Sequence, residues 1–411
     1  MDYSEVLRKE LLPAFGCTEP IALALAAAKA GSYLKGQPIS MTAIVSANIY
    51  KNAHSVTVPA CQGRTGLGIA LLAGLFLGDP DKDLEVLNGI DSSKLDQISE
   101  KLEDGFLKID INHEETGVYV KIILNSTDEK VILILSGAHN HISYVEKDGK
   151  VLLDDFPKQV ESQDVDYSFD SIYEYADRAD LTPIKDLLDK QIDYNTKISE
   201  EGLLNDWGSG IGKQLINSPI EYDKLTAYAS AGSDARMTGC EFPVVINSGS
   251  GNQGITVSVP LIIYAREHDI DKEKLYRALC LSNLISLYIK QGVGKLSAYC
   301  GAVSAASACG AALAYMQGES KELVEETLSN SLAVNSGILC DGAKASCAAK
   351  IASSLRNAFM SLDQAKRGKS FKSGDGMVKE DIDKMIVSVG KIAKDGMKET
   401  DAVLLDQMLH N

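Results

Sequence analysis

The sequence contains no long hydrophobic run. Apolar stretches such as Gly66 to Gly78 are too short to cross a bilayer. The first residues, Met1 to Leu12, are polar and amphipathic and lack the apolar segment of a secretory signal. The chain also has no fixed-period repeat and no low-complexity tract. We therefore expect a cytoplasmic protein built from ordinary globular domains.

Basic residues are fewer than acidic ones. The 411 residues include 41 Lys and Arg but 57 Asp and Glu, which gives a formal net charge of −16. A nucleic-acid backbone or an anionic membrane surface would repel such a chain, so we expect neither as a partner. Apolar residues make up 45% of the sequence, which is normal for a globular protein, and the length suggests two or three domains.

Eight cysteines occur in a chain without an export signal, so we expect free thiols with metal-binding or catalytic roles rather than a disulfide framework. Cys300, Cys340 and Cys347 each lie among Gly, Ala and Ser residues. Such small neighbours let thiolates approach a bulky inorganic group, and three sulfurs leave one metal position without a protein ligand. An iron–sulfur cluster whose open iron acts as a Lewis acid is one interpretation. Three buried, small hydrophobic side chains are the other.

Hydrophobic periodicity divides the chain into two regions, and we predict an α+β fold. Residues 1–165 form an α+β region that begins with a helix after Thr18, the predicted N-cap. Its other predicted elements are a strand at 41–50, helices at about 65–77 and 93–103, and an antiparallel layer of strands at 107–111, 118–124, 131–136 and 142–145. The polar segment Asp154 to Asp166 is the predicted connection.

Residues 166–411 are predicted to form a large α-helical domain whose helices are rich in Ala, Gly and Ser and therefore pack closely. Its main predicted helices lie near 256–268, 271–290, 296–317, 320–335 and 343–362, with one or two more in the tail at 381–409.

The spacing of Cys340 and Cys347 constrains the local structure. On one continuous helix, residues seven apart share a face but lie about 10.5 Å apart along the axis, which is too far for one small cluster. Asp341 and Gly342 resolve this if Cys340 lies in a turn and Asp341 caps a helix that starts near Ala343. Cys347 then lies in an early turn, and the positive end of the helix faces the thiolates.

Cys309 competes with Cys300 as the first ligand. Residues nine apart lie on opposite faces of a helix, so only one of the two can point at the site. We favour Cys300, which lies next to the glycine that opens its segment. A zinc site stays an alternative, although three thiolates without a nearby His are not typical of structural zinc, which usually has four protein ligands.

Cys17 is the second cysteine feature, because it immediately precedes a predicted helix. The helix dipole is expected to lower the pKa of this thiol and favour a thiolate, which suits a nucleophile, a general base or a metal ligand. A packed cysteine before a cap is the alternative. We interpret His139 and His141 as structural. The remaining cysteines with no comparable context are Cys61, Cys240 and Cys280.

A glycine-rich turn at Gly249 to Gly254 can present successive backbone N–H groups to an anion, and Asn252 and Gln253 add side-chain donors. It lacks the features of a dinucleotide or nucleoside triphosphate site, and a plain tight turn is the alternative. Arg236 can form a bidentate pair with a substrate carboxylate. A structural ion pair with Asp234 or another acid is at least as well supported by the sequence.

Taken together, these residues resemble the L-cysteine desulfidase family (the UPF0597 group), a relative of the iron–sulfur L-serine dehydratase α-chain. The resemblance covers nearly the whole chain. Its motifs are Gly16-Cys-Thr-Glu-Pro20, Tyr50-Lys-Asn52, Gly137-Ala-His-Asn-His-Ile142, Ser233-Asp-Ala-Arg-Met237, Gly249-Ser-Gly-Asn-Gln-Gly254, Tyr299-Cys-Gly301 and Cys340-Asp-Gly-Ala-Lys344 with Cys347.

The resemblance implies a [4Fe-4S] cluster held by Cys300, Cys340 and Cys347 with one iron open, and it implies that Cys17 acts as a base. The spacing after Cys340 is shorter than in serine dehydratases, which favours the desulfidase. Cys61 departs from the family pattern by standing where a glycine-rich stretch is expected, so it has no assigned role.

The resulting hypothesis is β-elimination of L-cysteine to pyruvate, ammonia and sulfide. Cys17 removes the Cα proton, and Arg236, Asn252 and Gln253 hold the carboxylate. No lysine lies in a recognisable pyridoxal-phosphate motif, so we expect no such cofactor. The alternatives are an ammonia-lyase acting on L-serine or another β-substituted amino acid, and a non-catalytic thiol- or amino-acid-binding protein with structural zinc. The sequence leaves the oligomeric state open, a homodimer included.

Overall fold

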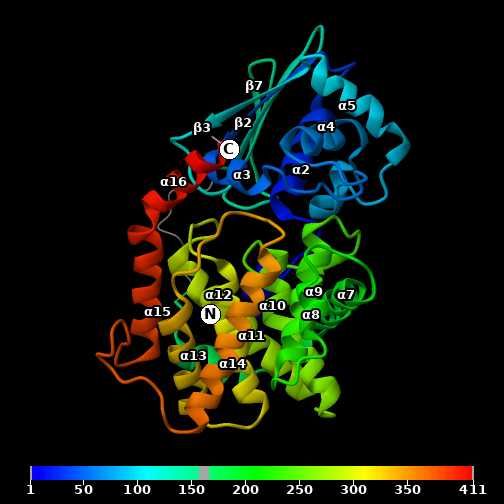
Figure 1. Cartoon of the computed structure of the whole chain (residues 1–411). Helices are drawn as coiled ribbons and strands as arrows, with labels where there is room; N and C mark the ends of the chain where they lie inside the picture. The colour runs from blue at the N-terminus through cyan, green and yellow to red at the C-terminus, as the bar shows by residue number, and fades with distance from the viewer. Residues whose placement is uncertain (1, 157–165, 410–411) are drawn as a thin grey trace.

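A mixed sheet with its helices forms one end of the molecule, and a body of packed helices forms the other (Figure 1). The structure, a computed structural model, describes residues 2–156 and 166–409. The six strands run in the order β3-β2-β4-β5-β6-β7. They are β3 (Leu107–Asn112), β2 (Ser40–Ser46), β4 (Tyr119–Asn125), β5 (Lys130–Ser136), β6 (Ile142–Lys147) and β7 (Lys150–Asp154).

The sheet buries one face against the helix α2 (Thr18–Tyr33). Side chains alternate along the strands, so that Val120, Ile122 and Leu124 of β4 are fully buried while the residues between them are not. The remaining helices at this end are α3 (Ala47–Ala53), α4 (Leu67–Leu77), α5 (Leu95–Glu103) and the short 3₁₀ turns η1 (Pro80–Glu85) and η2 (Ser92–Lys94).

The helical body consists of long helices around a small-residue core. The helix α12 (Gly301–Met316) is almost entirely buried, and an added Cβ at its Gly310 would lie 2.9 Å from the Cβ of Ala358 on α14 (Cys347–Lys366). The longer helices are α7 (Lys185–Leu204), α9 (Asp223–Met237), α10 (Gly251–Glu267), α11 (Lys272–Val293), α12 (Gly301–Met316), α13 (Lys321–Asn335) and α14 (Cys347–Lys366). The shorter ones are α6 (Phe169–Arg178), η3 (Thr182–Ile184), α8 (Ile211–Leu215), α15 (Ile382–Lys391) and η4 (Ile392–Gly396).

Both ends of the chain tie the two parts together. The N-terminal helix α1 (Tyr3–Glu10) packs on the helical body, where Ser4 Oγ lies 2.8 Å from the Tyr175 hydroxyl. β1 (Pro13–Phe15) pairs with β8 (Pro243–Val245) of the same body, and α2 then leads up to the sheet. At the other terminus α16 (Lys398–Leu409) reaches α3, where Asp401 pairs with Lys51 at 2.5 Å.

The predicted α+β class is confirmed, with three local corrections. The strand predicted at 41–50 ends at Ser46, because the Ser46 hydroxyl accepts from the Ile49 N–H and caps α3. The sheet is not wholly antiparallel, since β3 pairs in parallel with β2. β7 was not predicted; it is an exposed edge strand without the alternation on which the prediction relied. Most of the predicted connection at 154–166 lies outside the described residues.

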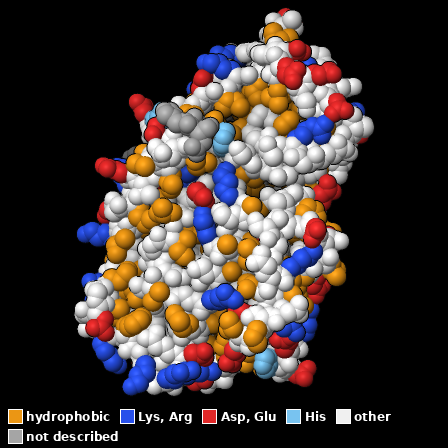
Figure 2. Space-filling view, in the orientation of Figure 1, with side chains coloured by type: hydrophobic (Ala, Val, Ile, Leu, Met, Phe, Trp, Pro, Cys, Tyr) orange, Lys and Arg blue, Asp and Glu red, His pale blue; other side chains and the backbone are white. Residues whose placement is uncertain are grey.

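On the face shown in Figure 2, acidic and basic side chains are interspersed rather than gathered in patches of one sign. Among the described residues, no helix is both long and apolar enough to span a bilayer.

Close packing of α2 and α4 makes a direct prediction for stability. A Cβ added at Gly74 would lie 2.2 Å from the Ala24 carbonyl oxygen, which is a backbone atom and cannot move cheaply. Gly74→Ala should therefore lower the free energy of unfolding by about 2 kcal/mol, measured by urea denaturation. The matched control is Gly396→Ala, whose added Cβ would meet only Ile392 at 3.9 Å. Equal stability of the two variants would contradict the packing described.

Candidate active site

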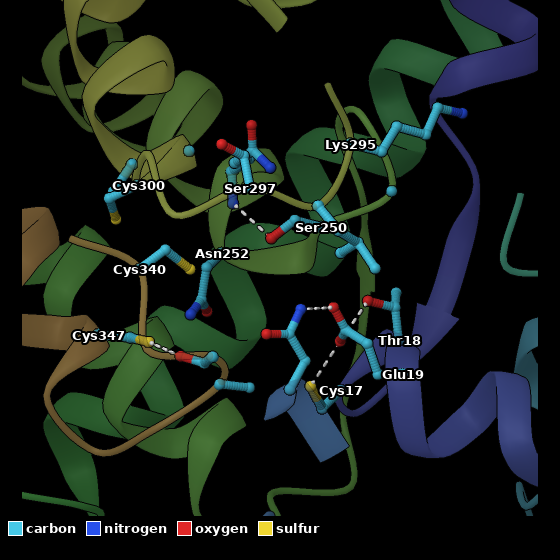
Figure 3. A pocket seen from close by; sticks show the side chains of 18 of the residues that line it. Cys17, Thr18, Glu19, Ser250, Asn252, Lys295, Ser297, Cys300, Cys340 and Cys347 are labelled. Atoms are coloured by element: carbon cyan, nitrogen blue, oxygen red, sulfur yellow. Dashed lines mark hydrogen bonds between the residues drawn. The ribbon is translucent and has the colours of Figure 1, made fainter. Parts of the chain in front are cut away.

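One pocket collects the N-terminal ends of four helices. Cys17 is the N-cap of α2, Ser250 that of α10 and Cys300 that of α12, while Cys347 is the first residue of α14. All four line the pocket. Each helix end carries partial positive charge and unsatisfied N–H groups, so the pocket suits anions and thiolates. Figure 3 shows Cys300, Cys340 and Cys347 along one side, with Cys17 opposite them.

A short backbone pairing brings Cys300 and Cys340 together although they are forty positions apart. Cys300 N donates to the Ile338 carbonyl at 3.0 Å, and Cys340 N donates to the Ala298 carbonyl at 2.7 Å. The interaction between the two neighbouring thiols raises the pKa of Cys300 and lowers the pKa of Cys340. Cys340 is thus the thiol of this pair that ionises first.

Cys340 is also held from the sheet end of the molecule. Lys51, which is only 2% exposed, donates from Nζ to the Cys340 carbonyl at 3.1 Å. Gly342 follows with a φ of +92°, and an added Cβ there would lie 2.9 Å from the Lys51 carbonyl oxygen. Glycine is therefore required where this loop crosses α3.

The local prediction around Cys347 needs correction. The helix begins at Cys347 rather than near Ala343, because Gly342 turns the chain away from a helical path. Asp341 is not its cap; it forms an ion pair with Lys350 instead. The Cys347 sulfur accepts from the Lys344 N–H at 3.4 Å, and burial raises its pKa to about 11.

Cys17 precedes α2 as predicted, but Cys17 and not Thr18 is the N-cap of that helix, and the predicted thiolate is wrong. Burial raises the pKa of the Cys17 thiol well above its ordinary value, and the charge of Glu19 raises it further. Both effects outweigh the helix dipole. The thiol donates to Glu19 Oε2 at 3.2 Å.

Arg236, Asn252 and Gln253 also line the pocket. Arg236 donates from Nη2 to the Gly16 carbonyl at 2.8 Å and from Nη1 to Asn252 Oδ1 at 3.3 Å. The alternative ion pair with Asp234 does not form, because that carboxylate accepts from backbone N–H groups, including Gly212 N at 3.2 Å.

The glycine-rich turn is shorter than predicted. The Ser250 hydroxyl caps α10, so residues 251–254 form the first turn of that helix. The N–H groups near the pocket therefore belong to a helix end, not to an open loop. Gln253 Oε1 is buried without a hydrogen-bond partner among the described residues.

Two buried cations face the pocket without a carboxylate partner. Among the described residues, no carboxylate lies within ion-pair distance of Arg236 or Lys290, which are 3% and 4% exposed. Burial lowers the pKa of Lys290 to about 8. Glu19 is the one carboxylate among the described lining residues, and it is hydrogen-bonded to other side chains.

The other cysteines lie outside the described lining of the pocket. Cys309 is fully buried within α12, and burial alone raises its pKa. Cys61 is fully buried as well, and burial raises its pKa to about 12. Cys240 and Cys280 are buried in the hydrophobic core.

Sequence patterns did not single out several residues that shape the site. Lys51 and Asn52 belong to one motif of the sequence, and Glu19 lies two residues after Cys17 in another, but the sequence alone assigns no role to these three residues. Lys290 lies within an ordinary helical pattern and gave no signal.

The lining thiols Cys300, Cys340 and Cys347 are the candidate metal ligands. In the described part of the chain, no three or more His, Cys, Asp or Glu side chains are arranged to hold one metal ion. In a four-iron cluster each cysteine binds a different iron, so its ligands need not surround one point. Cys300, Cys340 and Cys347 satisfy this looser requirement by lining one pocket from three segments.

The fold and the pocket define a class: an α+β protein with a buried, thiol-lined, electropositive pocket formed mainly by helix N-termini. Residues 81–406 match the family described as serine dehydratase alpha chain. The chain is 44% identical to a UPF0597 protein of Lachnoclostridium phytofermentans and 42% identical to one of Finegoldia magna, covering 99% of both chains in each comparison. The chain therefore belongs to the serine dehydratase alpha chain family, within its UPF0597 group, and this membership indicates a related lyase function.

The unpaired charge of Lys290 makes a prediction for the cluster-free protein. A lysine whose pKa falls on folding binds fewer protons when folded, so stability is lost as the pH falls from 10.5 towards 8. Below pH 8 the full cost is roughly 3 kcal/mol. Lys290→Met should raise the free energy of unfolding by up to that amount at pH 7, and the gain should shrink by pH 10.

Chemical denaturation at the two pH values measures this gain. The control is Lys197→Met, which removes an exposed lysine paired with Asp193 and should change stability by less than about 0.5 kcal/mol. The expected result is a larger stability gain of Lys290→Met over wild type at pH 7 than at pH 10. An equal gain at the two pH values would contradict an unpaired buried charge at Lys290.

Proposed function

We propose that the protein is an L-cysteine desulfidase that converts L-cysteine to pyruvate, ammonia and sulfide by β-elimination. The observation that carries the proposal is the composition of one pocket: three thiols on one side, Cys17 on the other, and two buried cations without carboxylate partners. A thiolate-bound cluster and an amino-acid carboxylate are both anions, and this pocket is suited to hold both.

Cys300, Cys340 and Cys347 would hold a [4Fe-4S] cluster, a cofactor for which the serine dehydratase alpha chain family is known. When bound, such a cluster supplies a Lewis-acidic iron that lacks a protein ligand and can stabilise a leaving sulfide. The protein contributes the helix ends and Lys290, whose positive charge offsets the negative charge of three thiolates.

The substrate carboxylate is assigned to Arg236 and the first turn of α10. The Arg236 guanidinium is already oriented by Gly16 and Asn252, and its Nε has no hydrogen-bond partner among the described residues. The unpartnered Gln253 Oε1 can accept a hydrogen bond from the substrate ammonium group. Fixing both groups orients the Cα–H bond, which is the purpose of such contacts in catalysis.

Cys17 is assigned as the base that takes the Cα proton. It lies beside the Arg236 contact, since Gly16 precedes it in the chain, and it faces the pocket from the end of α2. Loss of the proton and of sulfide yields aminoacrylate, which leaves and hydrolyses to pyruvate and ammonia without the enzyme. No pyridoxal phosphate is needed in this scheme.

The second candidate is an ammonia-lyase acting on L-serine, which the description of the matching family favours. The two functions differ in their products. Sulfide release from L-cysteine should exceed pyruvate formation from L-serine when both are measured anaerobically on the same preparation. Pyruvate from L-serine with no sulfide from L-cysteine would replace the desulfidase by the serine lyase.

The ligand assignment predicts the colour of the variants. Cys300→Ala, Cys340→Ala and Cys347→Ala should each bleach the brown chromophore of anaerobically purified protein, because each removes one of three thiolates. Cys309→Ala is the matched control: it changes a cysteine of the same helix as Cys300 but outside the described lining, and it should keep its colour. Full absorbance and activity in the three ligand variants would refute the assignment.

The base assignment predicts a different phenotype for Cys17→Ser. This variant should keep the chromophore but lose at least about 100-fold in kcat, because a serine hydroxyl is a much weaker base. Cys61→Ser, at a buried cysteine outside the described lining, serves as control and should retain turnover. Loss of the chromophore in Cys17→Ser would make Cys17 a cluster ligand instead.

A further inference from the structure

The Glu19 carboxylate is built into the site directly beside Cys17. It is 8% exposed and accepts three hydrogen bonds from side chains: from Cys17 Sγ at 3.2 Å, from Thr18 Oγ1 at 3.1 Å and from Asn52 Nδ2 at 3.0 Å (Figure 3). Thr18 and Asn52 fix the carboxylate, which leaves Oε2 aimed at the thiol. A carboxylate present only to favour the helix end would not need these contacts.

His139 extends this arrangement away from the thiol. It comes from the loop between β5 and β6, is 4% exposed, and places Nε2 3.9 Å from Glu19 Oε1. That nitrogen has no hydrogen-bond partner among the described residues. A buried, unpartnered ring nitrogen next to a buried carboxylate is costly unless the pair serves a purpose.

Ionisable groups from three other segments face Cys17 and Glu19: Arg236 from α9, His139 from the β5–β6 loop and Lys344 from the segment before α14. Burial lowers the pKa of His139, which favours its neutral ring. Burial acts to raise the pKa of Glu19, but the neighbouring His139 ring, the hydrogen bond from Cys17 and the charge of Arg236 bring that pKa below its ordinary value. In the resting pair the carboxylate is therefore ionised and the proton lies on sulfur. The Cys17 thiol can therefore act as a base only after another group has accepted its proton.

We propose that Glu19 is the proton acceptor that makes Cys17 a base, an inference that rests on the proposed function. The Sγ–H bond of Cys17 breaks and an O–H bond forms at Glu19 Oε2. The thiolate then takes the Cα proton of the substrate, and the electron pair of that C–H bond forms the Cα=Cβ double bond. The Cβ–S bond breaks, and its electron pair leaves with the sulfur as hydrosulfide. The hydrosulfide takes the proton from Glu19, directly or through water, and departs as hydrogen sulfide.

Glu19→Gln tests this step, because glutamine keeps the size and the Asn52 contact but cannot take the proton. At pH 7 kcat for L-cysteine should fall by at least about 100-fold, with the chromophore and KM unchanged. Activity should then rise with pH, as hydroxide replaces Glu19 in deprotonating Cys17. A role in structure alone would lower activity equally at all pH values.

Two further variants sharpen the test. Glu19→Asp keeps a protonatable group, so its kcat should lie between those of wild type and Glu19→Gln. Glu201→Gln, which changes a carboxylate that accepts from the Trp207 ring outside the pocket, should behave like wild type. A Glu19→Gln protein with the kcat and pH profile of wild type would overturn the proposal. A Glu19→Asp protein whose kcat is no higher than that of Glu19→Gln would also overturn it.

A measurement without substrate separates this inference from the proposed function. The rate of Cys17 alkylation by iodoacetamide, followed by peptide mass spectrometry, should titrate at lower pH in Glu19→Gln than in wild type, because the repelling carboxylate is gone. Identical titrations would overturn the Cys17–Glu19 coupling. A shifted titration in a protein that releases no sulfide would support the coupling and reject the desulfidase.

Discussion

Burying positive charge without a carboxylate partner costs free energy, and the pocket of this protein does so twice, with Arg236 and Lys290. Four helix N-termini add their partial charges to the same space. Glu19 is the one carboxylate among the described lining residues, and the remaining positive charge favours further anionic occupants. Under the proposed function, these anions would be the thiolates of the cysteine trio with their cluster and the carboxylate of an amino acid.

The rest of the fold serves to bring these helix ends together. The backbone pairing of residues 298–300 with 338–340 aligns Cys300 and Cys340, and Lys51 anchors the second segment to α3. Lys51 is in turn held by Asp401, close to the end of the chain, so the C-terminal helix contributes to the site from a distance. The strand pair of β1 with β8 then positions Cys17 at the opposite wall.

Local chemistry made part of this predictable from the sequence. Alternating apolar residues placed β4 and β5 correctly, and small residues around three cysteines pointed to one site. Features that depend on contacts between distant segments could not be predicted from the sequence. The sequence around Lys290 gives no sign that its charge lacks a partner. The predicted low pKa of Cys17 was wrong because burial and the neighbouring Glu19 charge raise it, and both depend on how distant segments pack. The start of α14 was misplaced because the backbone at Gly342 is set by its contact with α3.

The central claim is that the pocket holds an iron–sulfur cluster on Cys300, Cys340 and Cys347. Its most direct test is the iron, zinc and acid-labile sulfide content of the protein purified without oxygen. The account predicts about four iron and four sulfide per chain, with no stoichiometric zinc. Zinc in place of iron, with no labile sulfide, would contradict it.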